Sequence, residues 1–555
     1  MKKTICTALM LALTCAAGIG SQTSIPAVNS DDACTDIVVG RLASKDGSVI
    51  TSHTGACDEC RVHVVKGRTF AKGAKAPVYW GLQDVRSDID EYGEILGYIP
   101  QAPKTYTYFH SGYSHINEHQ LAIGESTMSQ KKELRTNRKD GKQIMTVEQA
   151  MIFALQRCRK SRDAVDLIGS LMETYGFLPS CGPESEALCI ADPEEAWVLE
   201  MFSVGTDWVP GSGKPGVIWA AQRVPDDHIA IVPNWSIIKE IDLSRPEWFK
   251  ASSNYMQEAI DRGWYDPETG APFIWQKAYS PVPREWSVGR FWLFFHMYAP
   301  SAKNWPDKTM TNAYRGYDSY HQYIEDISIY PFSVKPDSQL SVQDVIAFQR
   351  SVFSGTIYDM TNDFDWYIPD GKGGMKKSPL TTPFPTKDMR ELLDITHRRM
   401  VSRGGYGMVA QLRSWLPDPI GGVYWFYVDN QHVSTYVPIY AGVTEISPFY
   451  KEYNPDKYSR TSARWAVDFV DNMLYLKWQD AMQDLRHMRD PLEREFFTGQ
   501  DAVDKKALEL YNKKPATAKK YLTVYSRKAM EKTVNMYHSL QDSLITKYTN
   551  NKQHL

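Results

Sequence analysis

Cys34-Thr35-Asp36-Ile37-Val38-Val39-Gly40 opens the first β-rich stretch of the chain, and the fold can be read outward from it. Residues 36–40 and 48–54 are strand-like runs on either side of Ser44-Lys45-Asp46-Gly47, and Asp-Gly is a strong signal for a tight turn between paired strands. The sequence therefore predicts a β-hairpin that starts next to Cys34, followed by a third strand over residues 61–66.

The residues before Cys34 have the features of an export signal. Lys2 and Lys3 give a positive start, residues 5–17 form an apolar run too short to span a bilayer, and residues 16–21 are small. We expect a signal peptide over residues 1–20 and a short disordered propeptide over residues 21–33. Leu13-Thr14-Cys15 only loosely resembles a lipidation signal, so the expected product is periplasmic or secreted, without a membrane anchor.

The later sequence mixes hairpins with blocks of helix. Thr146, with Gln149 three residues on, predicts a capped helix start, and a second helix is expected from Ser161 until Gly176. Strands are expected over residues 187–190, 196–202, 216–224, 228–233, 406–416 and 422–428, and helices from about residue 461. This order predicts an α+β fold of antiparallel sheets sandwiched by helices. We expect a catalytic domain over residues 34–450 and a helical C-terminal region over residues 451–555.

Composition excludes one class of partner. The 555 residues carry a net charge of −3, and no basic arm or arginine-rich face emerges, which argues against nucleic-acid binding. Neither a phosphate-cradling glycine loop nor a serine-nucleophile elbow is present. The sequence does not reveal the oligomeric state, and a homo-oligomer is compatible with it.

A cut before Cys34 would turn this residue into a nucleophile that carries its own base. A free α-amine has a pKa of about 7.7 to 8.0 and a thiol about 8.5, so the amine can accept the thiol proton near neutral pH. The thiolate could then attack an amide carbon. While the Ala33-Cys34 bond is intact the amine does not exist. The alternative is that Cys34 forms half of a disulfide.

Several blocks of sequence together resemble the dipeptidase family of N-terminal-nucleophile cysteine hydrolases, relatives of the penicillin V acylases and bile salt hydrolases. The resemblance implies an αββα sandwich, self-removal of the propeptide, no cofactor, and a cysteine peptidase that hydrolyses dipeptides or short peptides. The blocks that carry it are Cys34-Thr35, Val39-Gly40, Ala43-Ser44, Asp46-Gly47-Ser48, Asn117-Glu118, Leu121-Ala122-Ile123-Gly124-Glu125-Ser126-Thr127, Ile190-Ala191-Asp192, Glu195-Ala196-Trp197, Arg223-Val224-Pro225-Asp226, Tyr358-Asp359-Met360, Arg413-Ser414-Trp415-Leu416-Pro417 and Gly421-Gly422-Val423-Tyr424-Trp425-Phe426.

The resemblance also suggests partners for Cys34. Asn234 follows a predicted strand where the wider superfamily has an oxyanion-hole asparagine, although it could equally be a turn residue. Asp36 lies two residues from Cys34, on the same face of the strand, and could hold the α-ammonium or simply face solvent. The acylase relatives have Arg-Asn-x-Asp on the second strand, whereas this chain has Ser52-His53-Thr54-Gly55, so that arginine and aspartate are not carried over.

A dipeptidase must bind two charged termini. A carboxylate suits the amine and an arginine suits the carboxylate. Glu125, Arg223 and Arg413, which lie in the matched blocks, are candidates, and each could instead belong to a structural ion pair. An acylase for non-peptide amides is the runner-up, because its mechanism would be identical, and a non-catalytic exported binding protein is the third hypothesis.

Six cysteines remain after the signal. Local pairing suggests disulfides Cys57–Cys60 and Cys181–Cys189, with Cys158 as a buried thiol in a helix. His53, Cys57, Cys60 and His63 also fall at a spacing that a zinc site could use. An exported setting and the absence of a second, spaced ligand pair favour the disulfide, so no metal is expected.

Overall fold

A computed structural model describes residues 34–55, 57–84, 93–281, 285–302, 330–356, 359–393 and 403–549. Residues 31–555 form one compact unit. The expected signal peptide and propeptide lie outside the described residues. In the described part of the chain, no helix is both long and apolar enough to cross a membrane.

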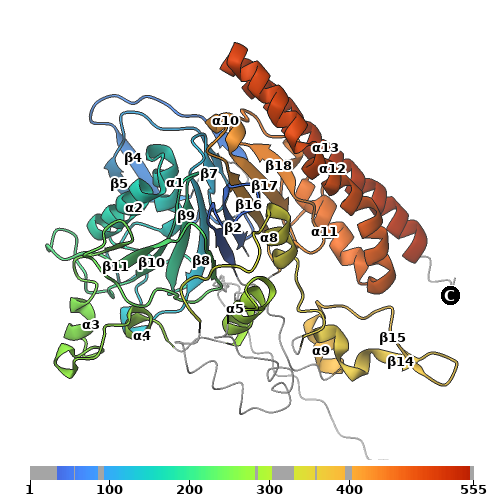
Figure 1. The fold of residues 1–555 in the computed structure, drawn as a ribbon, viewed down its shortest axis with the longest axis horizontal. Helices are drawn as coiled ribbons and strands as arrows, with labels where there is room; N and C mark the ends of the chain where they lie inside the picture. Colours follow the sequence, from blue (N-terminus) through green and yellow to red (C-terminus); the bar gives the residue numbers. More distant parts are fainter. Residues whose placement is uncertain are drawn as a thin grey trace, which may run out of the picture. The chain divides into compact units, whose positions relative to one another are not determined.

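Cys34 leads directly into the second strand from one edge of a six-stranded antiparallel sheet. Figure 1 shows this sheet with the helices around it. The expected hairpin is present, because Val38 pairs with Thr51 and Val39 with Ile50, and Gly47 in its connection has a φ of 84°. The strand order in this sheet is β12 (Ile229–Val232), β1 (Asp36–Val39), β2 (Val49–Gly55), β16 (Tyr406–Leu412), β17 (Val423–Val428) and β18 (Val437–Tyr440).

A second antiparallel sheet has eight strands and packs face to face on the first. Its β8 and β9 lie against β2 and β1. The predicted third strand, β3 (His63–Val65), belongs to the far edge of this second sheet. The order is β13 (Phe249–Ala251), β11 (Ile218–Val224), β10 (Ala196–Phe202), β9 (Ser185–Ala191), β8 (Ala122–Met128), β7 (Ile116–Asn117), β6 (Tyr108–His110) and β3. Two separate hairpins are β4 (Lys75–Trp80) with β5 (Glu94–Pro100), and β14 (Tyr367–Pro369) with β15 (Met375–Lys377).

Helices α1 (Val147–Arg157) and α2 (Ser161–Tyr175) pack on the second sheet, as the sequence predicts. The Thr146 side chain accepts from the backbone N–H of Gln149, which caps α1. The return bond of a capping box is absent, because Gln149 Oε1 accepts from the backbone N–H of Tyr79 at 3.0 Å. Gly176, with a φ of 73°, ends α2 where expected.

The remaining long helices cover the first sheet and its surroundings. They are α5 (Glu285–Tyr298), α8 (Val342–Gln349), α11 (Ala463–Leu474), α12 (Trp478–Lys513) and α13 (Pro515–Tyr548). α8 contacts β2 and β16, α11 contacts β17, and α13 contacts β18. Short helices are η1 (Lys132–Leu134), α3 (Gln257–Asp261), η2 (Pro267–Thr269), α4 (Trp275–Tyr279), η3 (Met360–Asn362), η4 (Phe364–Trp366), α9 (Lys387–Leu392), α10 (Asp418–Gly421) and η5 (Pro448–Tyr450).

The C-terminal helices share the core of the sheets. Arg350 pairs with Glu493 at 2.7 Å, the Tyr440 hydroxyl donates to Asp504 at 2.8 Å, and Tyr537 donates to the carbonyl of Val433 at 2.8 Å. Buried apolar residues of α11 to α13 belong to the same hydrophobic cluster as those of β1 and β2. The helical region is therefore packed into the body of residues 31–555.

Candidate active site

The Cys34 thiol lies at the entrance to β1 and touches a carboxyl group. Only 8% of the residue is exposed, and Sγ donates to Glu125 Oε2 across 4.0 Å. The backbone is fixed at this point, because Thr35 donates to Thr54 Oγ1 at 2.9 Å and Thr54 returns a bond to the carbonyl of Thr35 at 3.2 Å. Burial raises the pKa of the Cys34 thiol well above its usual range, and the charge of Glu125 adds to the rise.

A buried arginine from α5 ties the nucleophile strand to the end of β12. Arg290 donates to the carbonyl of Cys34, to Thr35 Oγ1 at 2.8 Å, to the carbonyl of Pro233 at 2.8 Å and to Asn234 Oδ1 at 2.9 Å. Burial lowers the pKa of Arg290 to about 9, which still leaves it charged at neutral pH. Four acceptors on two chain segments are thus held by one guanidinium.

Asn234 adopts a left-handed turn conformation. Its φ is 59°, a left-handed value that asparagine tolerates better than most residues. Its backbone N–H donates to Ser126 Oγ at 3.0 Å, and its side-chain Nδ2 donates to the carbonyl of Thr127 at 2.7 Å. The Asn234 amide is therefore held against β8, the strand that carries Glu125.

Two glutamates on neighbouring strands form an acid pair close to the thiol. Glu125 on β8 and Glu186 on β9 are diagonal neighbours, since Thr127 pairs with Glu186, and both are fully buried. Thr127 Oγ1 donates to Glu125 Oε1 at 3.2 Å, whereas neither oxygen of Glu186 is hydrogen-bonded within the described residues. Among the described residues no lysine or arginine forms an ion pair with either side chain.

Burial sets the protonation of this acid pair. Burial raises the pKa of Glu125, and contacts with the side chains of Glu186, Thr127 and Tyr113 partly lower it again. Burial also raises the pKa of Glu186 well above the usual range, and the charge of Glu125 raises it further. The two buried carboxyls therefore favour keeping one proton between them.

Asp36 is also buried beneath Cys34, and its neighbour is His53. Asp36 Oδ1 lies 3.2 Å from His53 Nδ1, and the same nitrogen lies 2.8 Å from the carbonyl of Glu125. Burial lowers the pKa of His53 well below its usual value, so the ring is neutral. Burial and the charge of Glu125 raise the pKa of Asp36. Cys34, Asp36, Glu125 and Asn234 are therefore brought together.

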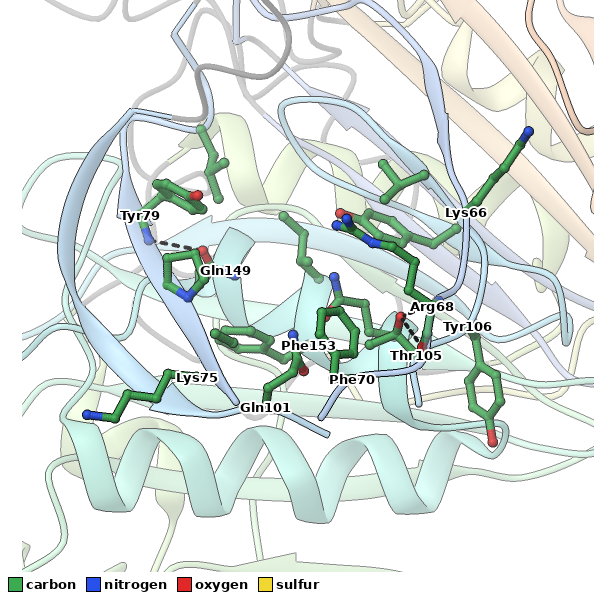
Figure 2. Close-up of a pocket in the computed structure, with 17 residues that line it drawn as sticks. Lys66, Arg68, Phe70, Lys75, Tyr79, Gln101, Thr105, Tyr106, Gln149 and Phe153 are labelled. Atoms are coloured by element: carbon green, nitrogen blue, oxygen red, sulfur yellow. Dashed lines mark hydrogen bonds between the residues drawn. The ribbon is translucent and has the colours of Figure 1, made fainter. Parts of the chain in front are cut away.

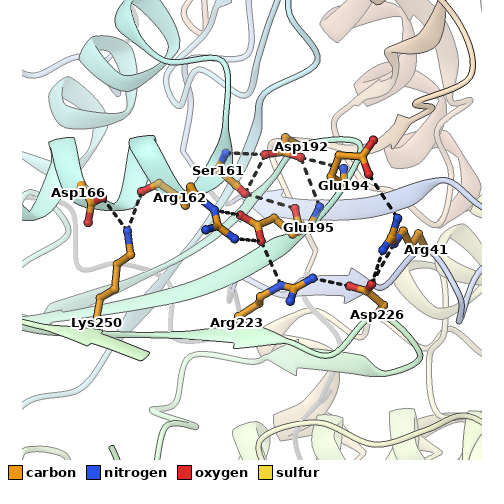
Figure 3. A network of polar contacts seen from close by, with 10 residues as sticks. All are labelled: Arg41, Ser161, Arg162, Asp166, Asp192, Glu194, Glu195, Arg223, Asp226 and Lys250. Atoms are coloured by element: carbon orange, nitrogen blue, oxygen red, sulfur yellow. Dashed lines mark hydrogen bonds and ion pairs between the residues drawn. The ribbon is translucent and has the colours of Figure 1, made fainter. Parts of the chain in front are cut away.

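Arg223 lies elsewhere, in a network of ion pairs at the opposite end of β1 (Figure 3). It pairs with Glu195 at 3.1 Å and with Asp226 at 2.7 Å. Asp226 also pairs with Arg41 at 2.8 Å, just beyond the last residue of β1. We call this set the arginine network; its members are Arg41, Ser161, Arg162, Asp166, Asp192, Glu194, Glu195, Arg223, Asp226 and Lys250.

Arg413 also lies away from Cys34. It follows β16, whose Leu412 pairs with Val49, while the start of the same strand pairs with Gly55 near Cys34. Six residue steps of β-strand separate these ends by roughly 20 Å. Arg413 pairs with Asp504 and donates to the carbonyls of Ile420, at 2.7 Å, and Gly421, at 2.9 Å. Its guanidinium connects the first sheet to α12.

The expected disulfides are not formed, since all six cysteines have free thiols. Cys181 lies in a loop where its sulfur is 2.9 Å from the Tyr113 hydroxyl, whereas Cys189 lies inside β9 opposite Gly124. Cys57 contacts the carbonyl of Glu59. Cys158 is the C-cap of α1 and is buried, so it is a buried thiol at a helix end.

The zinc alternative is not supported either. His53 is held by Asp36 and Glu125, and His63 lies on β3 at the edge of the other sheet. Within the described ranges, no three His, Cys, Asp or Glu side chains are placed to share a metal ion.

A cavity of about 170 Å³ lies between the β4–β5 hairpin and α1 (Figure 2). Its walls combine apolar rings such as Phe70 and Phe153 with polar groups such as Arg68 and Gln101. None of the predicted site residues lines it.

Sequence reasoning missed Arg290 and Glu186. Arg290 lies 256 positions from Cys34, in a helix rich in aromatic residues, and no local pattern links the two. Glu186 had a usable signal, because a carboxyl at the head of the apolar run Ala187-Leu188-Cys189-Ile190 must be buried when the strand is central.

Most of the chain is similar to one family of known proteins. Residues 33–490 match the model of Peptidase family C69. A probable dipeptidase of Latilactobacillus sakei is 22% identical over 449 residues, covering 78% of this chain and 79% of the relative. A probable dipeptidase B of Lactococcus lactis is 22% identical over 85% of this chain and 89% of the relative. A dipeptidase of Bifidobacterium longum is 22% identical over 78% of this chain and 75% of its own length.

Proposed function

The chain belongs to peptidase family C69, a family of cysteine peptidases, and from this premise we propose that it is a dipeptidase whose nucleophile is Cys34, freed as the N-terminal residue. The names of the relatives support the dipeptide substrate. The pairing of two antiparallel sheets with helices on their outer faces supports an N-terminal-nucleophile fold. The signal-like start supports an exported, periplasmic or secreted enzyme.

The proposed reaction uses the thiol and the α-amine of one residue. The amine takes the Sγ proton, Sγ attacks the scissile carbonyl carbon, and the leaving amine departs with a proton as a thioester forms. Water, activated by the same α-amine, then hydrolyses the thioester. Asn234 and Arg290, which meet at 2.9 Å, are the proposed groups for positioning and for the oxyanion.

The acid pair is the observation that favours a dipeptide over other amides. In a dipeptide the α-ammonium is bonded to the carbon next to the scissile carbonyl, so it must lie close to Sγ during attack. Glu125 Oε2 is 4.0 Å from Sγ and has no cationic partner in the described structure. A buried carboxylate is stabilised by a charge-assisted bond to an ammonium. We therefore assign the substrate amine to Glu125, with Glu186 behind it.

An acylase for non-peptide amides remains the second candidate, because the covalent chemistry would be the same. Its substrates place an uncharged acyl group next to the scissile carbonyl. Such a group would leave the acid pair buried without a cation, which costs free energy.

The deciding experiment compares Cys34→Ala with the wild type. The wild type should begin at Cys34 by N-terminal sequencing and should hydrolyse free dipeptides at least 100-fold faster than their N-acetylated forms. The Cys34→Ala protein should keep residue 33 and lose dipeptidase activity. Normal turnover by Cys34→Ala would overturn the nucleophile, and equal turnover of N-acetylated dipeptides would favour the acylase.

A further inference from the structure

We propose that Glu125 is the base that activates Cys34 for removal of its own propeptide, a role distinct from its service to the substrate afterwards. The inference rests on the proposed N-terminal nucleophile. It concerns the one step that the mature mechanism cannot perform, because the α-amine that later acts as base is still the amide nitrogen of the Ala33-Cys34 bond.

Direct contact selects Glu125 for this role. In the described structure Cys34 Sγ donates towards Glu125 Oε2 across 4.0 Å. Thr127 Oγ1 holds the other carboxyl oxygen at 3.2 Å, which orients the carboxylate. The carboxyl is fully buried, so bulk water does not compete for the thiol proton.

The Nδ1 atoms of the neighbouring histidines face groups other than the thiol. His53 Nδ1 lies between Asp36 Oδ1 and the carbonyl of Glu125, at 3.2 and 2.8 Å. His115 Nδ1 lies 2.7 Å from the carbonyl of Ile123, and burial lowers the pKa of His115 to about 4. Arg290 donates to the carbonyl of Cys34, not to its sulfur. In the described part of the chain, Glu125 is the one acceptor that the thiol contacts.

Glu186 supports the basicity of Glu125. Because Glu186 is fully buried beside it, placing a charge on both carboxyls at once is unfavourable. The acid pair therefore keeps one proton and has room for a second, and Glu125 is the member that contacts the thiol. This is what a base must do to take a proton from a thiol buried in the same environment.

Propeptide removal is an acyl transfer from the nitrogen to the sulfur of Cys34, followed by hydrolysis. Glu125 carboxylate takes the Sγ proton, and the thiolate attacks the carbonyl carbon of Ala33. The C–N bond to Cys34 breaks, and the departing nitrogen takes the proton from Glu125 and becomes the free α-amine. The product is a thioester between Ala33 and Cys34 Sγ. Water, with the new α-amine as base, hydrolyses it to the Ala33 carboxylate and a free thiol.

The experiment follows propeptide removal in purified full-length precursor, refolded from denaturant, by mass spectrometry. Glu125→Gln, which keeps the shape and removes the base, should slow removal at least 100-fold, and Glu125→Asp should be intermediate. Glu148→Gln is the matched control, because Glu148 is another buried carboxyl nearby, bonded to Ser180 Oγ at 2.7 Å. It should process at the wild-type rate.

A second form separates chemistry from folding. A Glu125→Gln chain carrying a site-specific protease site before Cys34 can be cut by that added protease. It should then expose Cys34 to alkylation by iodoacetamide and unfold at the temperature of the cut wild type, which shows an intact fold.

The outcomes distinguish the two proposals. Less than tenfold slowing in Glu125→Gln, with Cys34→Ala unprocessed, overturns the base and leaves the nucleophile. Processing of purified Cys34→Ala overturns the proposed function itself. Tenfold or greater slowing in Glu125→Gln, with Glu148→Gln normal, supports the assignment.

Discussion

Acidic side chains at the two ends of β1 differ in their burial and in their charged partners. At the Cys34 end, Glu125, Glu186 and Asp36 are fully buried, and in the described structure no lysine or arginine pairs with them. At the far end, in the arginine network, Asp226 contacts both Arg41 and Arg223, and its side chain is 20% exposed. The strand between these ends is only four residues long.

This difference distinguishes charged groups that stabilise the fold from charged groups suited to proton transfer or ligand binding. Ion pairs at the edge of the network, such as Arg41 with Glu194, are about half-exposed, and each contributes little to stability alone. Buried carboxyls without cations cost free energy and shift their pKa values, which is characteristic of groups that transfer protons or bind charged ligands. The proposed function accordingly places the chemistry at the Cys34 end of the strand.

The largest effect on activity should come from Arg290, which contacts the Cys34 end of β1. Arg290→Ala leaves four acceptors on Cys34, Thr35, Pro233 and Asn234 without their donor. Loss of this positioning should lower kcat/KM about 100-fold or more. Steady-state assays of the matured enzyme test this, with Arg290→Lys as the control that keeps the charge and loses the fork. An activity within threefold of wild type would refute the positioning role.

The next effect should be on stability alone. Arg413→Ala leaves Asp504 as an uncompensated buried charge, which should reduce the free energy of unfolding by about 3–5 kcal/mol in urea titrations. The double variant Arg413→Met, Asp504→Leu should recover most of the loss, since it buries no charge. If Arg413→Ala instead raised KM for dipeptides tenfold at unchanged stability, Arg413 would have to contact substrate.

Glu186 should reveal itself in the pH dependence of stability. Its pKa in the folded chain lies well above the ordinary value of about 4.3. A group of this kind contributes stability that is present below the unfolded pKa and is lost as the pH rises through the folded pKa. One such proton gives a slope of up to about 1.4 kcal/mol per pH unit.

The measurement is the unfolding temperature between pH 4.5 and pH 8. It is best made in Cys34→Ala, so that every sample has the same processing state. Adding Glu186→Gln should flatten the decline with rising pH. An unchanged decline would mean that another buried acid, such as Asp36, carries the slope.

The smallest effect should come from the arginine network. Arg223→Ala should cost about 1 kcal/mol of stability, because Arg162 still pairs with Glu195 and Arg41 still pairs with Asp226. KM for dipeptides should stay within twofold of wild type. A tenfold rise in KM, with no such rise in Arg41→Ala, would make Arg223 the group that binds the substrate carboxylate.

Local signals account for the parts of the molecule that were predicted. Asp46-Gly47 located the first turn, Thr146 the start of α1, and Gly176 the end of α2, because caps and turns depend on neighbouring residues. Cys34, Asp36 and Glu125 were suggested by the resemblance, and the structure places them together.

The parts that escaped prediction depend on distant pairing. Arg290 reaches Cys34 from 256 positions away, and Arg413 and Asp504 are 91 positions apart. Whether an arginine in a matched block faces a substrate or a partner carboxylate depends on such contacts. The burial of Glu186 depends on β9 being flanked on both sides, by β8 and β10.

The strand order of the first sheet also determines how late during synthesis the sheet can assemble. β1 lies between β2 and β12, which begins at residue 229, and β2 is flanked by β16, which begins at residue 406. A ribosome adds about 5–20 residues per second, so these flanking strands emerge on the order of tens of seconds after Cys34. Until then the thiol lacks the sheet that positions it against Glu125, and a half-made chain carries no assembled peptidase.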